Sequence, residues 1–488
     1  MKNKVYRLLL IVFIISLSVF IIGCSSGKKS ETMSSEEVNT QEDDVDAESD
    51  DVITLKLWAF SWTAAALSDM ARDYQAKHPG IKIEVLSLTW EEMSEKLLLA
   101  INSGINIPDI AIMDPHFLGT LINIKGLHSI ENDVDPAFRK KFIDAAWNVY
   151  NYQGHQYGVP IDIDFNVMFY RYDIVSKAIA KAGLKSFPKT WDEFIKVGEI
   201  IATDEEFKFE DGSHPYLISI EKGGVYAWEQ TFLAPSGGHV FSADYTKPAF
   251  HEPNSVASVL FMRELLEKEI ATVWNPEHGD IIPELKSGRI LIHSAGPWWR
   301  QDLCQSVGAN QVGKYRIANN PVAKPGNPMN VLGGSCVSIT KACKYKKEAL
   351  DFIKSLYTPK NIQAYYHAVG SPPPVRSFYK NPAVFLPPRK SDNADEYNFY
   401  HFFGKQKVMT LLYAAIQKSE PMQLILDNRI EDEVLIEALD VTLDENIDSS
   451  EVPKILFRYA RKAKELLSEF TEHEYLPYFV RRNDEGER

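Results

Sequence analysis

Aromatic and acidic side chains at predicted strand ends are the first residues of this chain that could do chemistry. Trp58 follows the alternating stretch 53–57, and Asp114 follows the short apolar run 108–113. In open α/β sheets, ligands bind beyond the carboxyl ends of the strands. An indole ring can stack on a flat ligand face, and a carboxylate can accept hydrogen bonds from a ligand. The two residues therefore predict a ligand site, with helix capping as the alternative role of Asp114.

A second group of carboxylates has the spacing that opens a calcium-binding loop. Asp162, Asp164 and Asn166 alternate with Ile and Phe, and the glycine and terminal glutamate of such a loop are missing. We therefore expect no metal site here, and the alternation instead indicates a long strand over 158–170, in a hinge. The chain also lacks G-x-S-x-G, H-E-x-x-H and G-x-x-x-x-G-K motifs, so nothing supports a hydrolase, metalloprotease or NTPase, and no cofactor is expected.

The elements that must position these side chains alternate between strand and helix, which predicts a parallel sheet with right-handed crossovers. The apolar spacing predicts strands at 53–57, 81–85 and 108–113. Thr89 with Glu92 has the spacing of a capping box, as does Thr190 with Glu193. Residues 405–470 are expected to be mostly helical, with an apolar stripe that indicates packing.

The first 51 residues predict export and lipid attachment. A basic start precedes a 15-residue apolar stretch at 8–22, which is short for a membrane span and typical of a signal peptide. The stretch ends at Gly23-Cys24 and resembles a bacterial lipobox, which implies removal of a lipoprotein signal peptide, 1–23, and a lipid on Cys24. An uncleaved anchor with an incidental cysteine is the alternative. Residues 24–51 hold ten acids and no aromatic residue, so we expect an acidic disordered tether.

Charge and cysteine content narrow the function classes. The 488 residues carry 53 Lys plus Arg against 67 Asp plus Glu, a net charge of −14. This sign disfavours phosphate backbones, so we expect no nucleic-acid partner. Only the N-terminal stretch is apolar enough to meet a bilayer, which excludes a multi-span permease. Cys304, Cys336 and Cys343 form no CxxC pair, so no zinc site is expected, although one disulfide could form outside the cell.

The order of several motifs resembles a known family. After the lipobox come "PDIAIMD" at 108–114, "YGVPIDIDFNVMFY" at 157–170, "LKSGRILIHSAGPWW" at 285–299 and "VLGGSCVSITKACKYKKEALDFIKSL" at 331–356. Together they are similar to the extracellular solute-binding protein family 1, the sugar-binding components of ABC importers, over most of residues 52–380.

This resemblance implies an α/β fold of two lobes in the manner of periplasmic binding proteins, with hinge strands and a helical C-terminal region. Lobe one would comprise 52–162 plus 333–380, and lobe two 163–332 plus 381–488. Two departures concern the substrate more than the fold. Tyr170-Arg171 replaces the tyrosine-asparagine expected after the hinge strand, and the region 380–450 is longer than the family pattern.

The resemblance also implies site residues. The family places a stacking aromatic at Trp298 or Trp299 and a second-lobe aromatic at Tyr226 or Trp228. In lobe one, further tryptophans occupy strand-end, loop or cap positions, and core packing is the alternative for each of them. Glycine before a strand allows close approach of backbone N–H groups to a ligand, with a hinge turn as the alternative. The predicted ligand-binding set is Trp58, Trp62, Trp90, Asp114, Tyr226, Trp298, Trp299 and Gly334.

The implied function is that of a lipid-anchored receptor on the extracellular face of the cytoplasmic membrane. It would bind a sugar or oligosaccharide in the interlobe cleft and deliver it to the permease subunits, with their ATPase, of an ABC importer. We expect a monomer without enzymatic activity. A secreted glycosidase is the alternative, because Asp114 with Asp162 or Asp164 could supply the two carboxylates that such an enzyme needs.

Overall fold

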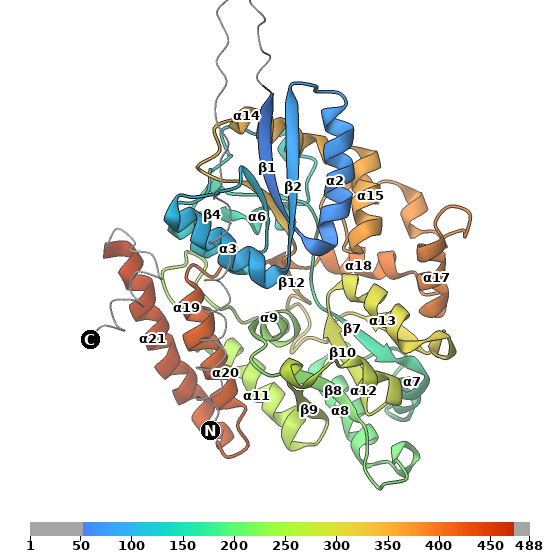
Figure 1. Ribbon diagram of the computed structural model, residues 1–488. Helices are drawn as coiled ribbons and strands as arrows, with labels where there is room; N and C mark the ends of the chain where they lie inside the picture. Colours follow the sequence, from blue (N-terminus) through green and yellow to red (C-terminus); the bar gives the residue numbers. More distant parts are fainter. Residues whose placement is uncertain (1–51, 473–488) are drawn as a thin grey trace, which may run out of the picture. The chain divides into compact units, whose positions relative to one another are not determined.

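Two five-stranded sheets carry the fold of residues 52–472, the part of the chain that the computed structural model describes (Figure 1). The first sheet has the order β2-β1-β3-β13-β6. Its strands β1, β2 and β3 are parallel, as the sequence predicts, whereas β13 runs antiparallel to both of its neighbours. The strands are β1 (Ile53–Phe60), β2 (Ile81–Leu88), β3 (Ile110–Met113), β6 (Val159–Pro160) and β13 (Cys336–Ile339).

The second sheet has the order β11-β7-β10-β8-β9. Strand β8 is parallel to β9 and β10, and β7 is antiparallel to β10 and β11. Its strands are β7 (Val167–Arg171), β8 (Tyr216–Glu221), β9 (Ala271–Trp274), β10 (Ile290–Ala295) and β11 (Tyr315–Ala318). Two short ladders lie outside the sheets, β4 (Asn151–Tyr152) with β5 (His155–Gln156) and β12 (Val331–Leu332) with β14 (Glu420–Pro421).

Helices between the strands begin where the capping pattern predicts. The Thr89 hydroxyl accepts from the Glu92 N–H, and the Glu92 carboxylate accepts from the Thr89 N–H, which completes the predicted capping box. Thr190 also caps its helix, but Glu193 accepts from the Lys189 N–H instead. The first helices are α2 (Ser61–Gln75), α3 (Trp90–Ser103), α4 (Pro115–Asn123), α5 (Pro136–Arg139), α6 (Asp144–Asn148), α7 (Tyr172–Lys181) and α8 (Trp191–Thr203).

The central part of the chain adds further helices to both sheets. They are α9 (Val225–Trp228), α10 (Ala234–Ser236), α11 (Pro253–Glu267), α12 (Ile282–Ser287), α13 (Arg300–Val307), α14 (Lys346–Ser355), α15 (Pro359–Val369) and α16 (Arg376–Tyr379). Helix α14 packs on β13 and α15 packs on α2, so both return to the first sheet. In the second sheet, helix α8 contacts β8 and helix α11 contacts β9.

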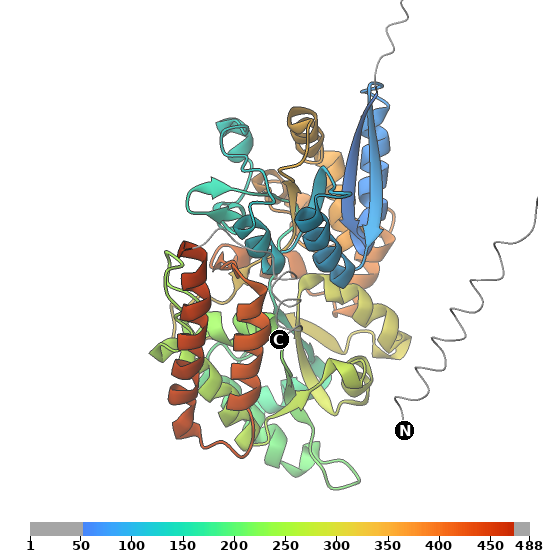
Figure 2. The ribbon, with the colours of Figure 1, turned by 60° about the vertical axis from the view of Figure 1, so that its left-hand side comes forward.

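The C-terminal region is helical, as expected, and it contacts both sheet systems. Helix α21 packs beside α20 and α11, so most of its apolar stripe faces the second sheet system, and Figure 2 shows α20 and α21 side by side. Helix α19, by contrast, packs on α4. These helices are α17 (Ala394–Phe402), α18 (Val408–Ile416), α19 (Asn428–Ile430), α20 (Ile436–Thr442) and α21 (Val452–Glu472).

All four strand predictions differ in extent from the structure; β2 runs on to Leu88, beyond the predicted 81–85, and β3 begins at Ile110, within the predicted 108–113. Strand β1 continues to Phe60, because Ala59 and Phe60 prolong its buried face, so Trp58 lies within the strand and not at its end. The long strand expected over 158–170 is divided into β6 and β7, which belong to different sheets.

The segment between β6 and β7 crosses from one sheet to the other. There the Ile161 N–H donates to the Ser335 carbonyl at 2.9 Å, and the Ile163 N–H donates to the Pro372 carbonyl at 2.8 Å. The Gly333 N–H donates to the Asp164 carbonyl at 2.8 Å. Three separate chain segments therefore meet at one crossing, which is the hinge expected from the sequence. The lobe boundaries stay a prediction.

The structure shows whether three of the four cysteines form a disulfide. Cys304, Cys336 and Cys343 are free thiols, so no disulfide forms within residues 52–472. Cys24, the signal peptide and the acidic tether lie outside the described residues. None of the helices in residues 52–472 is both long and apolar enough to cross a membrane.

Candidate ligand-binding site

A cavity of about 880 Å³ is lined by residues from both sheet systems and from the hinge. Its size falls within the range of small-molecule sites in proteins. Seven of the eight sequence-predicted residues line this interlobe cavity: Trp62, Trp90, Asp114, Tyr226, Trp298, Trp299 and Gly334.

Trp58 is the predicted residue that does not line the cavity. It lies within β1, partly buried against the hydrophobic core, because the strand extends further than the pattern of residues 53–57 suggested. Trp228, considered beside Tyr226, is 2% exposed and donates its indole N–H to the Ser258 hydroxyl at 2.8 Å, so it is a core residue.

Three tryptophan rings in the cavity remain well exposed. Trp62 is 47% exposed and stacks on Phe60, with ring centroids 4.6 Å apart and planes 9° apart. Trp90 and Trp298 are 39% and 41% exposed. Large apolar rings held open to solvent offer flat faces on which a ligand can stack.

Asp164 orients two of the aromatic rings. Its Oδ2 accepts from the Trp298 indole N–H at 3.0 Å and from the Tyr226 hydroxyl at 3.5 Å, while its Oδ1 accepts from the Phe165 N–H. Burial raises the pKa of Asp164 to about 6. Because Asp164 lies in the hinge and both rings belong to the second sheet system, it ties the aromatic wall to the crossing segment.

Trp299 touches the cavity but is mostly a core residue. It is 7% exposed, and its ring meets Phe169 edge-on with centroids 5.1 Å apart. Trp298 and Trp299 are adjacent in sequence but follow Gly296-Pro297 in a 3-10 turn, which directs the two rings differently. Of the pair, Trp298 therefore offers the larger ligand surface.

Asp114 combines its two predicted roles. It lines the cavity and also caps α4, with its Oδ1 accepting from the His116 N–H at 2.9 Å. Burial raises the pKa of Asp114. The neighbouring His116 pairs through Nδ1 with the Glu431 carboxylate oxygens, at 3.0 and 3.1 Å.

The charge state of His116 follows from this pairing. Burial by itself lowers the pKa of His116, but the carboxylates of Glu431, Asp114 and Glu229 raise it to about 10. The imidazole is therefore protonated at neutral pH. Its Nε2 is buried and has no hydrogen-bond partner among the described residues.

Gly334 and Asp162 close the hinge side of the cavity. The Ser335 N–H donates to Asp162 Oδ1 at 2.7 Å, and the Tyr365 hydroxyl donates to Oδ2 at 3.1 Å. Burial raises the pKa of Asp162 to about 7. Gly334 has φ of +110°, and a Cβ there would lie 2.7 Å from the Asp162 carbonyl oxygen, so this turn requires glycine.

Several lining residues escaped the sequence analysis. Glu221 and Trp274 end β8 and β9, so the strand-end rule that identified Asp114 could have found them. His116 follows Asp114 by two residues and carried no separate signal. Glu431 is 315 positions away from His116 and no sequence pattern joins the two.

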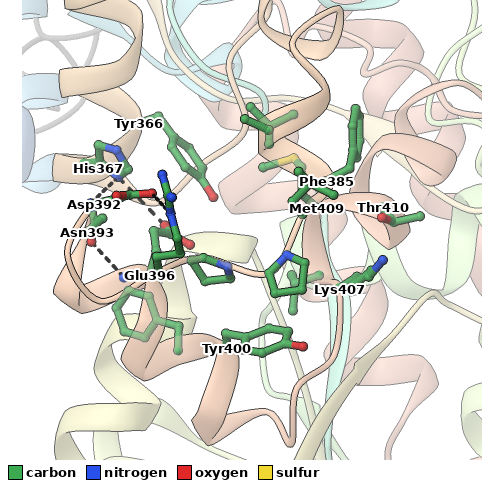
Figure 3. A pocket seen from close by; sticks show the side chains of 18 of the residues that line it. Tyr366, His367, Phe385, Asp392, Asn393, Glu396, Tyr400, Lys407, Met409 and Thr410 are labelled. Carbon is green, nitrogen blue, oxygen red and sulfur yellow. Dashed lines mark hydrogen bonds and ion pairs between the residues drawn. The ribbon is translucent and has the colours of Figure 1, made fainter.

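A second cavity of about 610 Å³ lies against the region 380–410 (Figure 3). Much of its polar wall is already internally paired. Arg300 contacts Glu396 at 2.7 Å and the Tyr366 hydroxyl at 3.2 Å, and Asn393 lies 3.0 Å from His367. Figure 3 shows His367, Asn393 and Glu396 on the other side of this cavity from Phe385 and Met409. We therefore assign the candidate site to the interlobe cavity, where polar groups remain available.

The described residues hold no group of three or more His, Cys, Asp or Glu side chains that could bind a metal ion.

The sequence pattern of the bacterial extracellular solute-binding proteins matches residues 69–388. The chain belongs to this family. The sequence resemblance is thereby confirmed, and the two-lobed α/β fold agrees with it.

Relatives of this solute-binding protein include the arabinooligosaccharide-binding protein of Halalkalibacterium halodurans. That protein is 22% identical over 73% of this chain and 77% of its own length. Among solved structures, the sugar-binding protein MalE from Xanthomonas citri matches with a TM-score of 0.69 at 18% identity, covering 86% of this chain and 100% of that one. The galacto-N-biose/lacto-N-biose I-binding protein of a Bifidobacterium longum ABC transporter matches with a TM-score of 0.65 at 19% identity, over 86% and 98% of the two chains.

Proposed function

We propose that this solute-binding protein is a receptor that binds a sugar or oligosaccharide in the interlobe cavity and delivers it to the permease of an ABC importer. The observation that carries the proposal is the composition of the cavity wall. Exposed tryptophans from both sheet systems face one space together with carboxylates and a protonated histidine. Sugars present apolar C–H faces and hydroxyl groups, and this wall offers a partner for each. The sugar ligands named for its relatives support the same assignment.

A thermal-shift screen against mono- and oligosaccharides tests this proposal. A ligand that binds only the folded state stabilises it by RT ln(1 + [L]/Kd), about 2.7 kcal/mol at one hundred times Kd. We expect at least one carbohydrate to raise the melting temperature of the parent, and the same sugar to act weakly on Trp298→Ala. A full panel without any shift would contradict carbohydrate binding.

We propose binding without hydrolysis. A glycosidase needs two carboxyl groups free to act on opposite sides of one glycosidic bond. Both oxygens of Asp162 accept hydrogen bonds from the protein, Asp164 holds Trp298 and Tyr226, and Asp114 caps α4. Incubation with the sugar that gives the largest thermal shift should release no reducing ends. Sustained release that disappears in Asp114→Asn would favour the glycosidase instead.

We propose further that the mature chain begins at Cys24 and is held at the extracellular face of the cytoplasmic membrane by lipid. The support is the short apolar stretch that ends in Gly23-Cys24. An acidic tether does not bind an anionic membrane, and stable anchoring takes two acyl chains. Cys24→Ala should move the protein from the membrane fraction to the medium. Retention of a leader-cleaved Cys24→Ala variant at the membrane would refute lipid anchoring.

A further inference from the structure

The charged groups that line the interlobe cavity are mostly acidic. Seven carboxylates and no Lys or Arg occur among the described residues that line it. The two histidines offset little of this excess: protonated His116 balances Glu431, with which it is paired, and burial lowers the pKa of His293 to about 4, so His293 is neutral. The seven carboxylates are Asp114, Asp162, Asp164, Glu221, Asp280, Asp302 and Glu431.

Three of these carboxylates belong to the second sheet system and have few protein partners. Glu221 and Asp302 accept no side-chain hydrogen bond and form no ion pair within residues 52–472. Asp280 accepts only from the Ile282 N–H, at 3.0 Å. Asp162, Asp164 and Glu431 accept protein hydrogen bonds at both carboxylate oxygens. Glu221 and Asp302 therefore keep both oxygens for a ligand, while Asp280 and Asp114 each keep one.

An aromatic ring stands beside them. Glu221 and Trp274 are register partners on the parallel strands β8 and β9, so their side chains leave neighbouring strands at the same level. The Trp274 indole N–H donates to the Gly279 carbonyl at 3.1 Å, and its ring meets His293 edge-on with centroids 5.8 Å apart. The ring is therefore held in place and lines the cavity next to the free acids.

Carboxylates in a cavity wall lose solvation when a ligand covers them, and this cost is recovered only if the ligand supplies donors or positive charge. Burial already raises the pKa of Glu221, and burial together with Asp280 raises the pKa of Asp302. An anionic sugar would add repulsion to this cost. A protonated amine would neutralise the acids and gain a cation–π contact with an indole ring.

We propose that Glu221, Asp280 and Asp302, beside Trp274, form a subsite for a protonated amine, so that the ligand is an oligosaccharide that contains an amino sugar. This inference rests on the proposed sugar-binding function. Beyond that function, the inference specifies that the ligand is positively charged and that its charge is bound at the end of the cavity formed by the second sheet system.

Calorimetric titration of the full chain with cationic, neutral and anionic oligosaccharides tests the subsite, and the cationic and neutral probes, whose affinities are compared, share the β-1,4 linkage. The probes are chitosan oligosaccharides, which carry free amines, cello-oligosaccharides of the same length, which carry hydroxyls there, and oligogalacturonates, which are anionic. At pH 6.5 and low salt we expect the chitosan probes to bind at least about tenfold more tightly than the cello probes, and the anionic probes not to bind. The preference should shrink as salt increases, because the added term is electrostatic.

Single-charge variants locate the effect. Glu221→Gln and Asp302→Asn should each reduce the ratio of chitosan to cello affinity by threefold or more. Asp69→Asn removes one exposed carboxylate, paired with Arg72 on α2 outside the cavity, and should leave the ratio unchanged. Absence of chitosan binding, or a ratio that neither cavity variant changes, would overturn the amine subsite. Binding of the cello probes in that case would leave the sugar-binding proposal standing.

Discussion

Trp298 and Trp299 are neighbours in sequence, but the structure gives them different surroundings. Trp298 is 41% exposed and bonded to Asp164, whereas Trp299 is 7% exposed and packed on Phe169. Exposed aromatic rings in a binding cavity commonly carry much of the binding energy. Trp298→Ala should therefore weaken carbohydrate affinity by about 2–4 kcal/mol with little change in melting temperature.

Trp299→Ala should show the opposite behaviour. Removing a buried tryptophan side chain leaves a void in the core and costs about 3–5 kcal/mol of unfolding free energy. Denaturant unfolding and calorimetric titration of both variants separate the two roles. If Trp298→Ala unfolds early while Trp299→Ala keeps its stability, the assignment of the two rings is reversed.

The ion pair between His116 and Glu431 stabilises the folded state, and this stabilisation decreases in the alkaline pH range. The pKa of His116 is raised from an ordinary value near 6.5 to about 10 in the folded state. Its stabilising contribution is therefore fully present below pH 6.5 and is lost as the pH rises through 10. We expect His116→Gln to lower the unfolding free energy most at pH 6 and progressively less toward pH 10. A difference between parent and variant that is constant over this range would contradict the ion pair.

At the scale of elements, local signals were read more reliably than long-range ones. The capping residues Thr89 and Thr190 fixed two helix starts, because a capping hydrogen bond depends on residues three apart. The division of 158–170 into two strands depends on partners at Gly333, Ser335 and Pro372, which lie far away in the chain. Alternation predicts an extended backbone, but it does not specify which sheet supplies the partner.

The same difference between local and long-range signals explains which residues of the site could be predicted from the sequence. Seven of eight predicted residues line the cavity because strand ends, helix caps and the family resemblance place side chains of both sheet systems around it. The prediction that Trp58 lines the site was wrong, because its strand continues to Phe60. Glu431 comes from the long region 380–450. This region contacts α4, and no periodic pattern in the sequence predicts that contact.

Helix α17 in that region is fixed to α13 by a buried ion pair. The Arg300 side chain is 4% exposed and contacts Glu396 at 2.7 Å, and its guanidinium lies over the Phe399 ring at 5.1 Å. Removing one member of a buried pair leaves an uncompensated charge, which typically costs about 3–5 kcal/mol. Glu396→Gln should therefore destabilise the protein by an amount of this order in denaturant unfolding.

An exposed pair provides the control for this prediction. Asp69 and Arg72 are 3.0 Å apart but more than 70% exposed, and such pairs contribute little. Asp69→Asn should change the unfolding free energy by less than about 0.5 kcal/mol. Equal effects of Glu396→Gln and Asp69→Asn would show that burial of Arg300 does not govern the strength of its pair.

At the scale of the whole molecule, the cavity offers a ligand contacts from both sheet systems. Trp62 and Trp90 line it from the first sheet system, while Trp274 and Trp298 line it from the second. A ligand that contacts both sets binds the closed arrangement better than an open one, and it shifts the population by that difference in affinity. The hinge permits such a shift, because few backbone hydrogen bonds cross between Ile163, Gly333 and Pro372.

We therefore expect a saturating carbohydrate, chosen from the thermal-shift screen, to reduce the radius of gyration measured by small-angle X-ray scattering. Trp298→Ala at the same sugar concentration should keep the radius of the unliganded protein, because its site is largely empty. The comparison uses one chain length and one buffer, so the tether contributes equally to every sample. If the radius of the parent stays constant while calorimetry reports saturation, the ligand is held by one lobe alone and closure is not part of binding.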